Sequence, residues 1–182
     1  MQMAMLRKRF KLKNNIAINF INLSKEEKGM VRRWRNNKDI RKWLFTGHII
    51  SAKEHSRFIE ALEKGDKNTY WLVKNISGES LGVISLNRIN FKNRNAYLGI
   101  YTNPEFRHPL AGRQLLALLK KIAFKIFKFH TLKLEVIADN KRAIGFYKKS
   151  GFIREGRLSE FVHKNGKWQD AIVMGIIRKG RN

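Results

Sequence analysis

Residues 132–152 read Leu132-Lys-Leu-Glu-Val-Ile-Ala-Asp-Asn-Lys-Arg-Ala-Ile-Gly-Phe-Tyr-Lys-Lys-Ser-Gly-Phe152, and they carry the clearest structural signal in the chain. Residues 131–138 are mostly apolar, which predicts a strand. The following residues 140–150 predict a short helix, because Asn140 is a good N-cap and Gly151 is a common residue just beyond a helix end. This part of the chain is therefore expected to form a strand followed directly by a helix.

The alternation of strands and helices continues on both sides of this unit. Seven strands are expected in all, over residues 16–23, 70–73, 81–86, 96–101, 131–138, 152–162 and 168–177. Four helices are expected, over residues 24–36, from Ser51 to about Leu62, over 112–129 and over 140–150. Serine-to-glutamate capping boxes open the first two helices, and Asn165-Gly166 predicts a tight turn between the last two strands. The order indicates an α/β protein.

Length and composition limit the domain organisation. The chain has 182 residues, 43% of them hydrophobic, which is enough for one packed domain. We expect residues 1–12 to form a basic N-terminal tail and residues 13–182 to form a single domain. The chain has no cysteine, so disulfides and a cysteine nucleophile are excluded. The basic N-terminus lacks a secretory apolar region, and no apolar run approaches the roughly 20 residues that span a bilayer. We therefore expect a cytoplasmic protein.

The net charge is the most unusual number. Thirty-nine Lys and Arg against 14 Asp and Glu give a formal charge of +25. Such a charge favours anionic partners, among them nucleic acid, nucleotide phosphates and acidic membranes, and does not choose between them.

A candidate anion site lies upstream, where the strand at 96–101 leads through a loop into the helix at 112–129. Free amides at a helix start bind anions, and Arg107 and Arg113 flank this one. An ordinary strand–loop–helix junction is the alternative. The loop has too few glycines for a dinucleotide fingerprint or a P-loop.

Residues 132–152 resemble the acetyl-CoA-binding core of the GNAT N-acetyltransferases, with the pattern L-x-L-x-V-x-x-x-N-x-x-A-I-x-F-Y-x-x-x-G-F intact. The resemblance covers residues 70–177. It implies a mixed, mostly antiparallel sheet of about seven strands, flanked by about four helices and splayed for acetyl-CoA, with no metal. The loop from Arg107 to Gly112 then resembles the family's pyrophosphate loop, with Leu110 in place of its first glycine. The implied acetyl-CoA contacts are Leu98, Gly99, Ile100, Arg107, Leu110, Ala111, Gly112, Arg113, Asn140 and Tyr147.

The resemblance also implies catalytic roles. Tyr147 would be the general acid that protonates the CoA sulfur, and Asn140 would bond the pantetheine arm. The structural alternatives are a tyrosine that packs its ring and an asparagine that caps the helix. Glu135 matches the general base of the ribosomal-protein-alanine N-acetyltransferases, a GNAT subgroup. Two alternatives stay open: Glu135 is an outward-facing strand residue paired with a lysine, or another base acts through a water molecule. Without a cysteine, direct transfer in a ternary complex is the simpler scheme.

For the acceptor, the N-terminal half resembles the amino-sugar N-acetyltransferases of the pseudaminic acid pathway, which acetylate a UDP-linked 4-amino-4,6-dideoxy sugar. The shared segments include Trp34-Arg-Asn36, Arg88-Ile-Asn-Phe91 and Tyr97-Leu-Gly-Ile-Tyr101. The implied acceptor contacts are Arg35, Leu44, Phe45, Asn87, Arg88 and Tyr97. Arg35 and Arg88 would meet the diphosphate, because a guanidinium offers phosphate a rigid fork. Core packing is the alternative for Trp34 and Trp43, and a structural role is the alternative for His55.

Two other functions remain as alternatives. One is a GNAT enzyme that acetylates the N-terminus of a ribosomal protein. The other, from a different class, is a non-catalytic protein that binds nucleic acid through the lysine-rich face of the helix at 112–129. The intact spacing from Asn140 to Tyr147 favours an enzyme without a specific nucleic-acid partner. The resemblance further implies a homodimer that pairs through the C-terminal strands.

Overall fold

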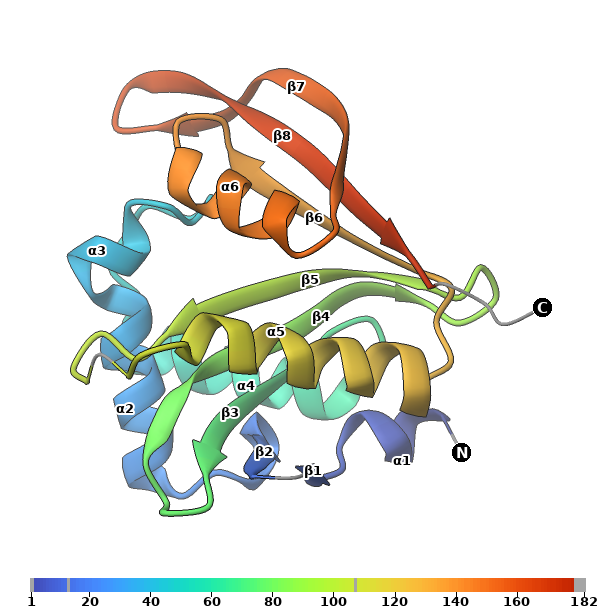
Figure 1. Ribbon diagram of the computed structural model, residues 1–182. Helices are drawn as coiled ribbons and strands as arrows, with labels where there is room; N and C mark the ends of the chain where they lie inside the picture. The colour runs from blue at the N-terminus through green and yellow to red at the C-terminus, as the bar shows by residue number, and fades with distance from the viewer. Residues whose placement is uncertain (1, 13, 107, 179–182) are drawn as a thin grey trace.

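The computed structural model of the protein describes residues 2–12, 14–106 and 108–178 (Figure 1). Within these residues one sheet contains eight strands in the order β1-β2-β3-β4-β5-β6-β8-β7. The strands are β1 (Phe10–Leu12), β2 (Asn15–Asn19), β3 (Thr69–Asn75), β4 (Ser80–Asn90), β5 (Asn95–Thr102), β6 (Thr131–Ile137), β7 (Ile153–Lys164) and β8 (Lys167–Ile177). The helices are α1 (Gln2–Leu6), α2 (Lys25–Asn36), α3 (Lys38–Arg41), α4 (Ala52–Lys64), α5 (Ala111–Lys121) and α6 (Lys141–Lys149).

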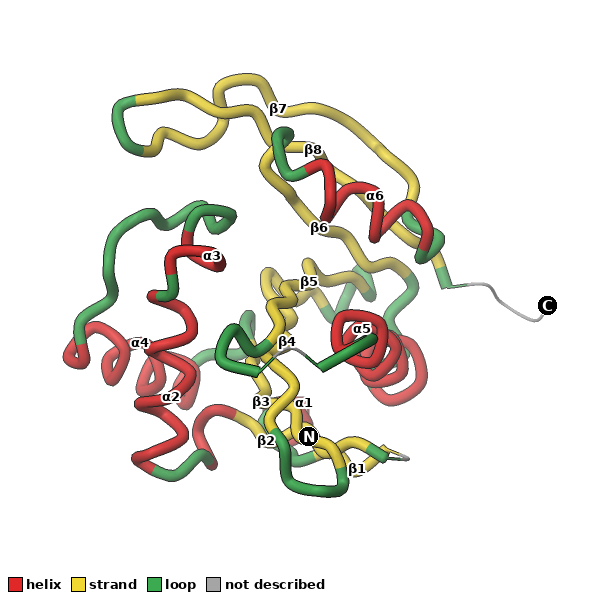
Figure 2. The backbone as a smooth tube through the Cα atoms, turned by 60° about the vertical axis from the view of Figure 1, so that its left-hand side comes forward, coloured by secondary structure: helices red, strands yellow, loops and turns green. Residues whose placement is uncertain are grey.

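Helices cover both faces of the sheet (Figures 1 and 2). Alternate side chains of β3 show why, since successive residues of a strand point to opposite faces. Trp71 and Val73 belong to the cluster that packs against α5, whereas Leu72 lies in a second cluster with Val31 and Trp34 of α2. The sheet is thus the middle layer, with α2 and α4 on one side and α5 on the other.

The predicted local signals are confirmed. Ser24 with Glu27 and Ser51 with Glu54 form complete capping boxes at the starts of α2 and α4. The strands β3, β4 and β5 form the expected antiparallel meander. β7 and β8 form the expected hairpin, in which Asn165 and Gly166 both adopt the positive φ angles of a tight turn.

Residues 2–12 differ from the expected basic tail, because two apolar side chains anchor them. Leu6 is 3% exposed and Phe10 is 8% exposed, and the Phe10 ring packs against Trp71. The Leu6 carbonyl accepts hydrogen bonds from Asn19 Nδ2 and from the Thr69 hydroxyl, at 2.7 Å each. Arg7, Lys8 and Arg9 separate the two anchors, so no apolar periodicity in the sequence marks the short α1 and β1. The sheet therefore has one strand more than the expected seven.

Two predicted elements end in a different conformation from the one expected, and one helix was not predicted. β2 ends at Asn19, whose side chain accepts from the Ile21 amide and starts a 3-10 turn, η1 (Phe20–Asn22). The helix expected over 112–129 changes to a π-helical turn, η2 (Ile122–Ile126), in which the Phe127 amide bonds the Ile122 carbonyl. The short helix α3 was not anticipated.

Candidate active site

The sheet opens between β5 and β6. These parallel strands pair only at Asn95↔Thr131, Ala96↔Leu132 and Tyr97↔Lys133. Beyond that point β5 pairs only with β4, and β6 pairs only with β8. Figures 1 and 2 show the two strands diverging. The β6-facing backbone groups of β5 are therefore left without a ladder partner, and an extended chain of amides can pair with such an edge.

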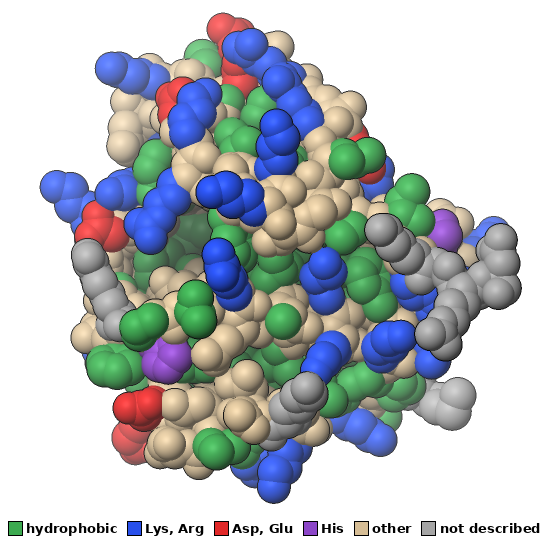
Figure 3. Space-filling view, viewed as in Figure 1, with side chains coloured by type: hydrophobic (Ala, Val, Ile, Leu, Met, Phe, Trp, Pro, Cys, Tyr) green, Lys and Arg blue, Asp and Glu red, His purple; other side chains and the backbone are tan. Residues whose placement is uncertain are grey.

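The predicted cofactor residues Leu98, Gly99 and Ile100 lie on the diverging part of β5. Gly99 has a packing reason to be glycine, because a Cβ added there would lie 2.5 Å from the Ser85 hydroxyl oxygen on β4. Figure 3 shows the surface hollowed between α6 and the N-terminal end of α5, with hydrophobic side chains inside and Lys and Arg around much of the rim. The divergence thus leads into an open cleft with a basic mouth.

The N-terminus of α5 borders this cleft. No acceptor among the described residues bonds the amides of Gly112 and Arg113, so both remain available to an anion. The Ala111 amide donates to the His108 carbonyl at 3.2 Å. Arg107, the first residue of the predicted pyrophosphate loop, lies outside the described residues.

Leu110 occupies the N-cap of α5 in the left-handed conformation, at φ 66° and ψ 3°. This is the position where the family's loop has glycine, and glycine is the residue that adopts positive φ without strain. The leucine side chain is 61% exposed, so core packing does not account for it. The loop therefore keeps the glycine backbone geometry although the glycine is absent.

The helix α6 carries the predicted pair Asn140 and Tyr147. The Asn140 side chain accepts a hydrogen bond from the Ala143 amide at 3.1 Å, which confirms its role as N-cap. Tyr147 is 8% exposed and packs edge-on against Phe146 and Phe152. Burial raises the pKa of the Tyr147 hydroxyl, so this group holds its proton throughout the neutral range.

The two helices that flank the cleft approach each other at the N-terminal end of α5. A Cβ added to Gly112 of α5 would lie 3.8 Å from the ring of Phe146 on α6. Because Phe146 precedes Tyr147, this contact brings the Tyr147 helix beside the free amides of α5. The anion site and the tyrosine thus belong to one cleft.

Glu135 projects from β6 and is held by an arginine rather than by the lysine considered as an alternative. Arg88 Nη1 and Nη2 donate to Glu135 Oε1 and Oε2 at 2.6 and 2.8 Å. The Arg88 guanidinium also lies 4.5 Å from the centroid of the Tyr97 ring. Hydrogen bonding to Glu135 raises the pKa of Arg88, and the negative charge of Glu135 adds to this effect. The neighbouring Lys133 bonds Glu155 instead, at 2.7 Å.

A β-bulge aims Arg88 at Glu135. The register of β4 against β5 shifts between Asn87 and Asn90, and Arg88 has a φ of 48°. Bulges of this kind turn a side chain away from its normal direction in a sheet. Asn87 points its amide to the Ser85 hydroxyl at 3.0 Å, so the three predicted acceptor residues Asn87, Arg88 and Tyr97 lie together on β4 and β5.

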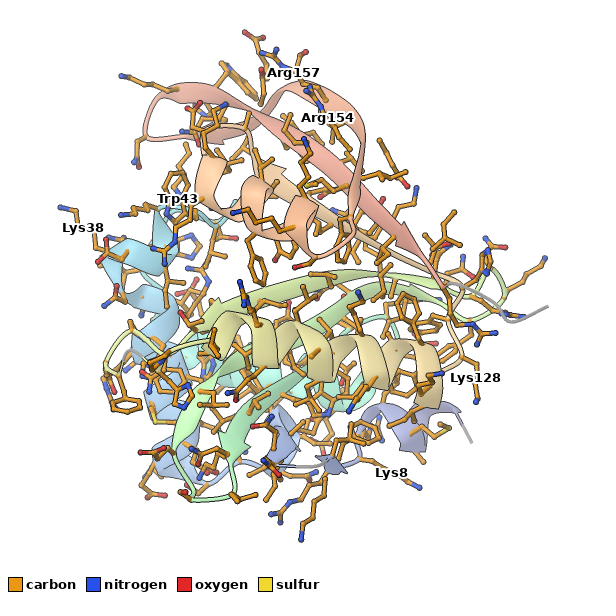
Figure 4. All side chains as sticks on the ribbon, in the orientation of Figure 1. Lys8, Lys38, Trp43, Lys128, Arg154 and Arg157 are labelled. Atoms are coloured by element: carbon orange, nitrogen blue, oxygen red, sulfur yellow. The ribbon has the colours of Figure 1, made fainter. Side chains whose placement is uncertain are left out.

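The other predicted acceptor residues lie on α2 and in the segment after α3. Arg35 Nη2 donates to the Thr46 carbonyl at 2.9 Å. Burial lowers the Arg35 pKa, Tyr101 and Tyr70 oppose this shift, and the charge of Arg41 adds a smaller lowering. Leu44 is half-buried, and the Phe45 ring packs edge-on against Phe161 of β7 at 5.8 Å. Figure 4 shows Trp43 of the same segment near the N-terminal end of α6, whereas Lys38 points away from the protein.

Core packing accounts for two of the aromatic candidates. Trp34 is 1% exposed within the cluster between α2 and the sheet. His55 is 8% exposed between Phe20 and Phe58, and burial, Arg32 and Lys28 lower its pKa. Trp43 differs, since it is 37% exposed.

The sequence analysis missed two cations beside the acceptor segment, Arg41 and Lys164. Arg41 Nη1 donates to the Gly47 carbonyl at 3.2 Å, and the Lys164 ammonium bonds three carbonyls of residues 41–44. Lys164 is more than 100 residues away in sequence, so no local pattern could pair it with this segment.

A pocket of about 470 Å³ lies between α6 and the β7–β8 hairpin. Its lining includes Lys141, Arg154 and Arg157, and Figure 4 shows the last two projecting from β7. Arg157 is already paired with Asp170. As far as the chain is described, the lining contains none of the predicted site residues. The divergence of β5 and β6 fits the shape and chemistry of a pantetheine arm better.

A sheet that splays between two parallel strands, with a helix N-terminus and a tyrosine-bearing helix at the opening, is the architecture of an acetyl-CoA-dependent acyltransferase. Residues 24–173 match the family model described as Acetyltransferase (GNAT) domain, and the chain therefore belongs to the GNAT acetyltransferase family. It is an enzyme that uses acetyl-CoA as its acetyl donor.

Relatives of two kinds resemble the chain. Acetyltransferase PseH of Campylobacter jejuni is 34% identical over 134 residues, which cover 74% of this chain and 82% of the relative. The spermidine N(1)-acetyltransferase of Vibrio cholerae is 27% identical over 79% of this chain and 83% of the relative. A crystal structure of the Vibrio cholerae spermidine N-acetyltransferase with CoA and spermine shares the fold, at a TM-score of 0.82 and 23% identity, over 92% of this chain and 97% of that one.

Two features are absent from the described residues. No group of three or more His, Cys, Asp or Glu side chains there is placed to hold a metal ion. No helix in the same residues is long and apolar enough to cross a membrane.

Proposed function

We propose that the protein transfers the acetyl group of acetyl-CoA to the 4-amino group of a UDP-linked 4-amino-4,6-dideoxy sugar, a step of pseudaminic acid biosynthesis for flagellin glycans. Two lines support the proposal. The PseH relatives from Campylobacter jejuni are 34% and 30% identical over most of the chain. The predicted acceptor residues Asn87, Arg88 and Tyr97 also lie together on β4 and β5.

The charge of the acceptor side is the observation that carries the choice of acceptor. Arg35 and Arg41 lie near Lys164, since burial and then these two cations lower the pKa of the Lys164 ammonium. Within the described residues no ion pair joins Arg35, Arg41 or Lys164 to a carboxylate. Unneutralised cations attract a diphosphate and repel a polyamine.

This charge separates the sugar nucleotide from a spermidine-like acceptor. A polyamine site needs carboxylates that face the ligand. Here the acidic group of the cleft, Glu135, already has both oxygens on Arg88. The observed groups instead offer guanidinium forks, which suit phosphate oxygens.

The proposed chemistry uses Glu135 and Tyr147. Glu135, directly or through a water, takes a proton from the acceptor ammonium, and the free amine attacks the thioester carbonyl carbon. This attack forms the C–N bond of the tetrahedral intermediate. Collapse of the intermediate breaks the C–S bond, and the nitrogen gives up its second proton to solvent. Tyr147 donates its proton to the departing thiolate; because burial raises the pKa of its hydroxyl, the proton is present at neutral pH.

The remaining residues of the proposal bind the two substrates. Backbone groups of Leu98, Gly99 and Ile100 pair with the pantetheine amides, and Asn140 adds a side-chain bond. The loop from Arg107 to Arg113 holds the pyrophosphate at the start of α5, with Leu110, Ala111 and Gly112 in close approach. Arg35 and Arg88 bind the acceptor diphosphate, and Leu44, Phe45, Asn87 and Tyr97 contact its sugar and base.

Three further statements belong to this proposal. Residues 13–182 act as one catalytic domain, to which α1 and β1 add. The enzyme works in the cytoplasm, where nucleotide sugars are made. Two copies pair through their C-terminal strands; among related structures, the spermidine N-acetyltransferase of Vibrio cholerae is described as dodecameric.

The test is an acetyl-transfer assay with three acceptors. Free CoA is measured with a thiol reagent, to which this chain adds no background because it has no cysteine. We expect CoA release and an acetylated product, seen by mass spectrometry, with the UDP-4-amino sugar. A UDP-sugar that lacks a free amine is the matched control. Turnover with spermidine or a ribosomal N-terminal peptide, and none with the amino sugar, would overturn the proposal.

A further inference from the structure

The Lys164 ammonium makes an unusual set of contacts. Lys164 is the last residue of β7, and its Nζ donates hydrogen bonds to the carbonyl oxygens of Arg41, Lys42 and Leu44 at 2.7, 2.9 and 2.9 Å. A lysine ammonium has three N–H donors, so all of them are used on one short stretch of backbone. The hairpin tip is thereby attached to the end of α3, more than 100 residues away in sequence.

Two packing contacts accompany these hydrogen bonds. The ring of Phe161, also on β7, lies edge-on to Phe45 at 5.8 Å. The stem of Lys164 lies against Gly47, where an added Cβ would come within 3.0 Å of the lysine Cγ. The β7 tip therefore contacts the acceptor segment 41–47 along its length rather than at one atom.

Side chains of α2 and α3 also bond this stretch of backbone. Arg35 donates to the Thr46 carbonyl and Arg41 to the Gly47 carbonyl. Three residues beyond the segment, the Asn36 side chain donates to the Ile50 carbonyl and accepts from the Ile50 amide, at 2.8 Å each. The segment has little helical structure of its own, and polar side chains of α2, α3 and β7 hold it in place.

The location of this contact gives it functional meaning. β7 belongs to the part of the sheet beyond the β5–β6 divergence, and α3 follows a helix that packs on the part before it (Figures 1 and 2). The contact of Lys164 with residues 41–44 therefore bridges the two parts of the sheet at the open end of the cleft. The bridged segment contains Leu44 and Phe45, which the proposed function places against the acceptor.

We propose that Lys164 is a positioning residue for the acceptor: it fixes segment 41–47 across the open end of the cleft and so sets the enzyme's affinity for the amine substrate. The proposal rests on the proposed function only in assigning this segment to the acceptor. The acetyl-CoA side, formed by β5, α5 and α6, is unaffected by the loss of these contacts.

The test compares Lys164→Met with a matched control. Methionine keeps the length of the stem and removes the three donors. Lys167→Met removes the same charge from the exposed residue that faces Lys164 across the hairpin turn. Lys164→Arg is a partial replacement, because a planar guanidinium cannot direct three bonds as an ammonium does.

The first measurement is hydrogen exchange of the amides of residues 42–44 in the ligand-free protein. These amides bond the carbonyls of Lys38, Ile40 and Arg41. In Lys164→Met we expect their exchange to be at least about tenfold faster, because local opening no longer breaks the ammonium contacts. Exchange in Lys167→Met should match the wild type, and Lys164→Arg should fall between. Unchanged exchange in Lys164→Met overturns the proposal.

The second measurement is kinetic. The KM for the acceptor should rise about tenfold in Lys164→Met, with the KM for acetyl-CoA within about twofold of the wild type. An equal rise in both constants would indicate general damage and contradict the positioning role. If the wild type does not acetylate the UDP-amino sugar, the proposed function fails, and the hydrogen-exchange result still decides whether Lys164 orders the segment.

Discussion

Arg88 and Glu135 form a two-bond ion pair across the strands β4 and β6, with the intervening Tyr97 ring beneath the guanidinium. Both carboxylate oxygens are occupied, and the Glu135 side chain is only 10% exposed. An amine can reach this carboxylate only if Arg88 gives up one of the bonds. A diphosphate competes for the guanidinium, so acceptor binding and release of the base are linked in the proposed mechanism.

Glu135→Gln is expected to lower kcat by about 10²–10⁴-fold, because glutamine cannot accept the ammonium proton. The kcat of the variant should therefore stay below that of the wild type across the pH range. The measurement is kcat from pH 5 to 9 for both proteins. A profile identical to that of the wild type would assign the proton transfer to a water held by other groups.

Arg88→Met should raise the acceptor KM by about tenfold or more, since it removes a bidentate phosphate donor, while kcat falls less. Lys92→Met is the control, because Lys92 is an exposed cation on the turn that follows β4. Steady-state kinetics with varied acceptor decide the matter. An unchanged KM would leave Arg88 with a purely structural role.

Tyr147→Phe should reduce kcat by about 10²–10⁴-fold with acetyl-CoA binding retained, because the ring packing survives and only the acid is lost. Binding is followed by titration calorimetry with CoA, and kcat by CoA release. Full activity in the phenylalanine variant would return Tyr147 to a packing role.

Tyr147 also predicts a pH dependence of stability. Burial raises its pKa above the ordinary tyrosine value of about 10, so the unfolded chain loses this proton before the folded one does. Its contribution is fully present below pH 10 and is lost as pH rises further, at up to about 1.4 kcal/mol per pH unit. Urea unfolding at pH 8 to 11 should show a smaller alkaline loss for Tyr147→Phe than for the wild type. Equal slopes contradict the assignment.

Leu110 makes a prediction about the pyrophosphate loop. Its left-handed backbone is unfavourable for any residue with a Cβ, by about 1–2 kcal/mol. Leu110→Gly should therefore be more stable than Leu110→Ala by about 1 kcal/mol, both variants having lost the same exposed side chain. Urea unfolding compares the two. A more stable alanine variant would show that the loop does not hold this conformation.

Local signals predicted much of the fold. The capping boxes at Ser24 and Ser51, the meander and the Asn165-Gly166 hairpin each depend on residues close in sequence, and all are present. Residues 2–12 were misread because Leu6 and Phe10 are isolated among cations, and only contact with Trp71 and Asn19 makes them part of the core.

The candidate site, like the fold, was predictable only where its residues are close together in the sequence. Asn140, Tyr147 and Glu135 stand in a local motif, which is why they could be proposed as site residues from the sequence. The partners of such residues were not predictable, because Arg88 reaches Glu135 through a bulge and Lys164 reaches residues 41–44 through the end of a hairpin. Such contacts join distant segments and leave no periodic trace in the chain.

The most direct test of the proposed function is the ratio of kcat/KM for the UDP-4-amino sugar to that for spermidine, measured with one preparation at one ionic strength. The cationic acceptor side predicts a ratio above about 10², equivalent to a few kcal/mol of differential transition-state binding. A ratio below 1 would contradict the account, because a polyamine would then be preferred although the cations Arg35, Arg41 and Lys164 lie beside the acceptor segment.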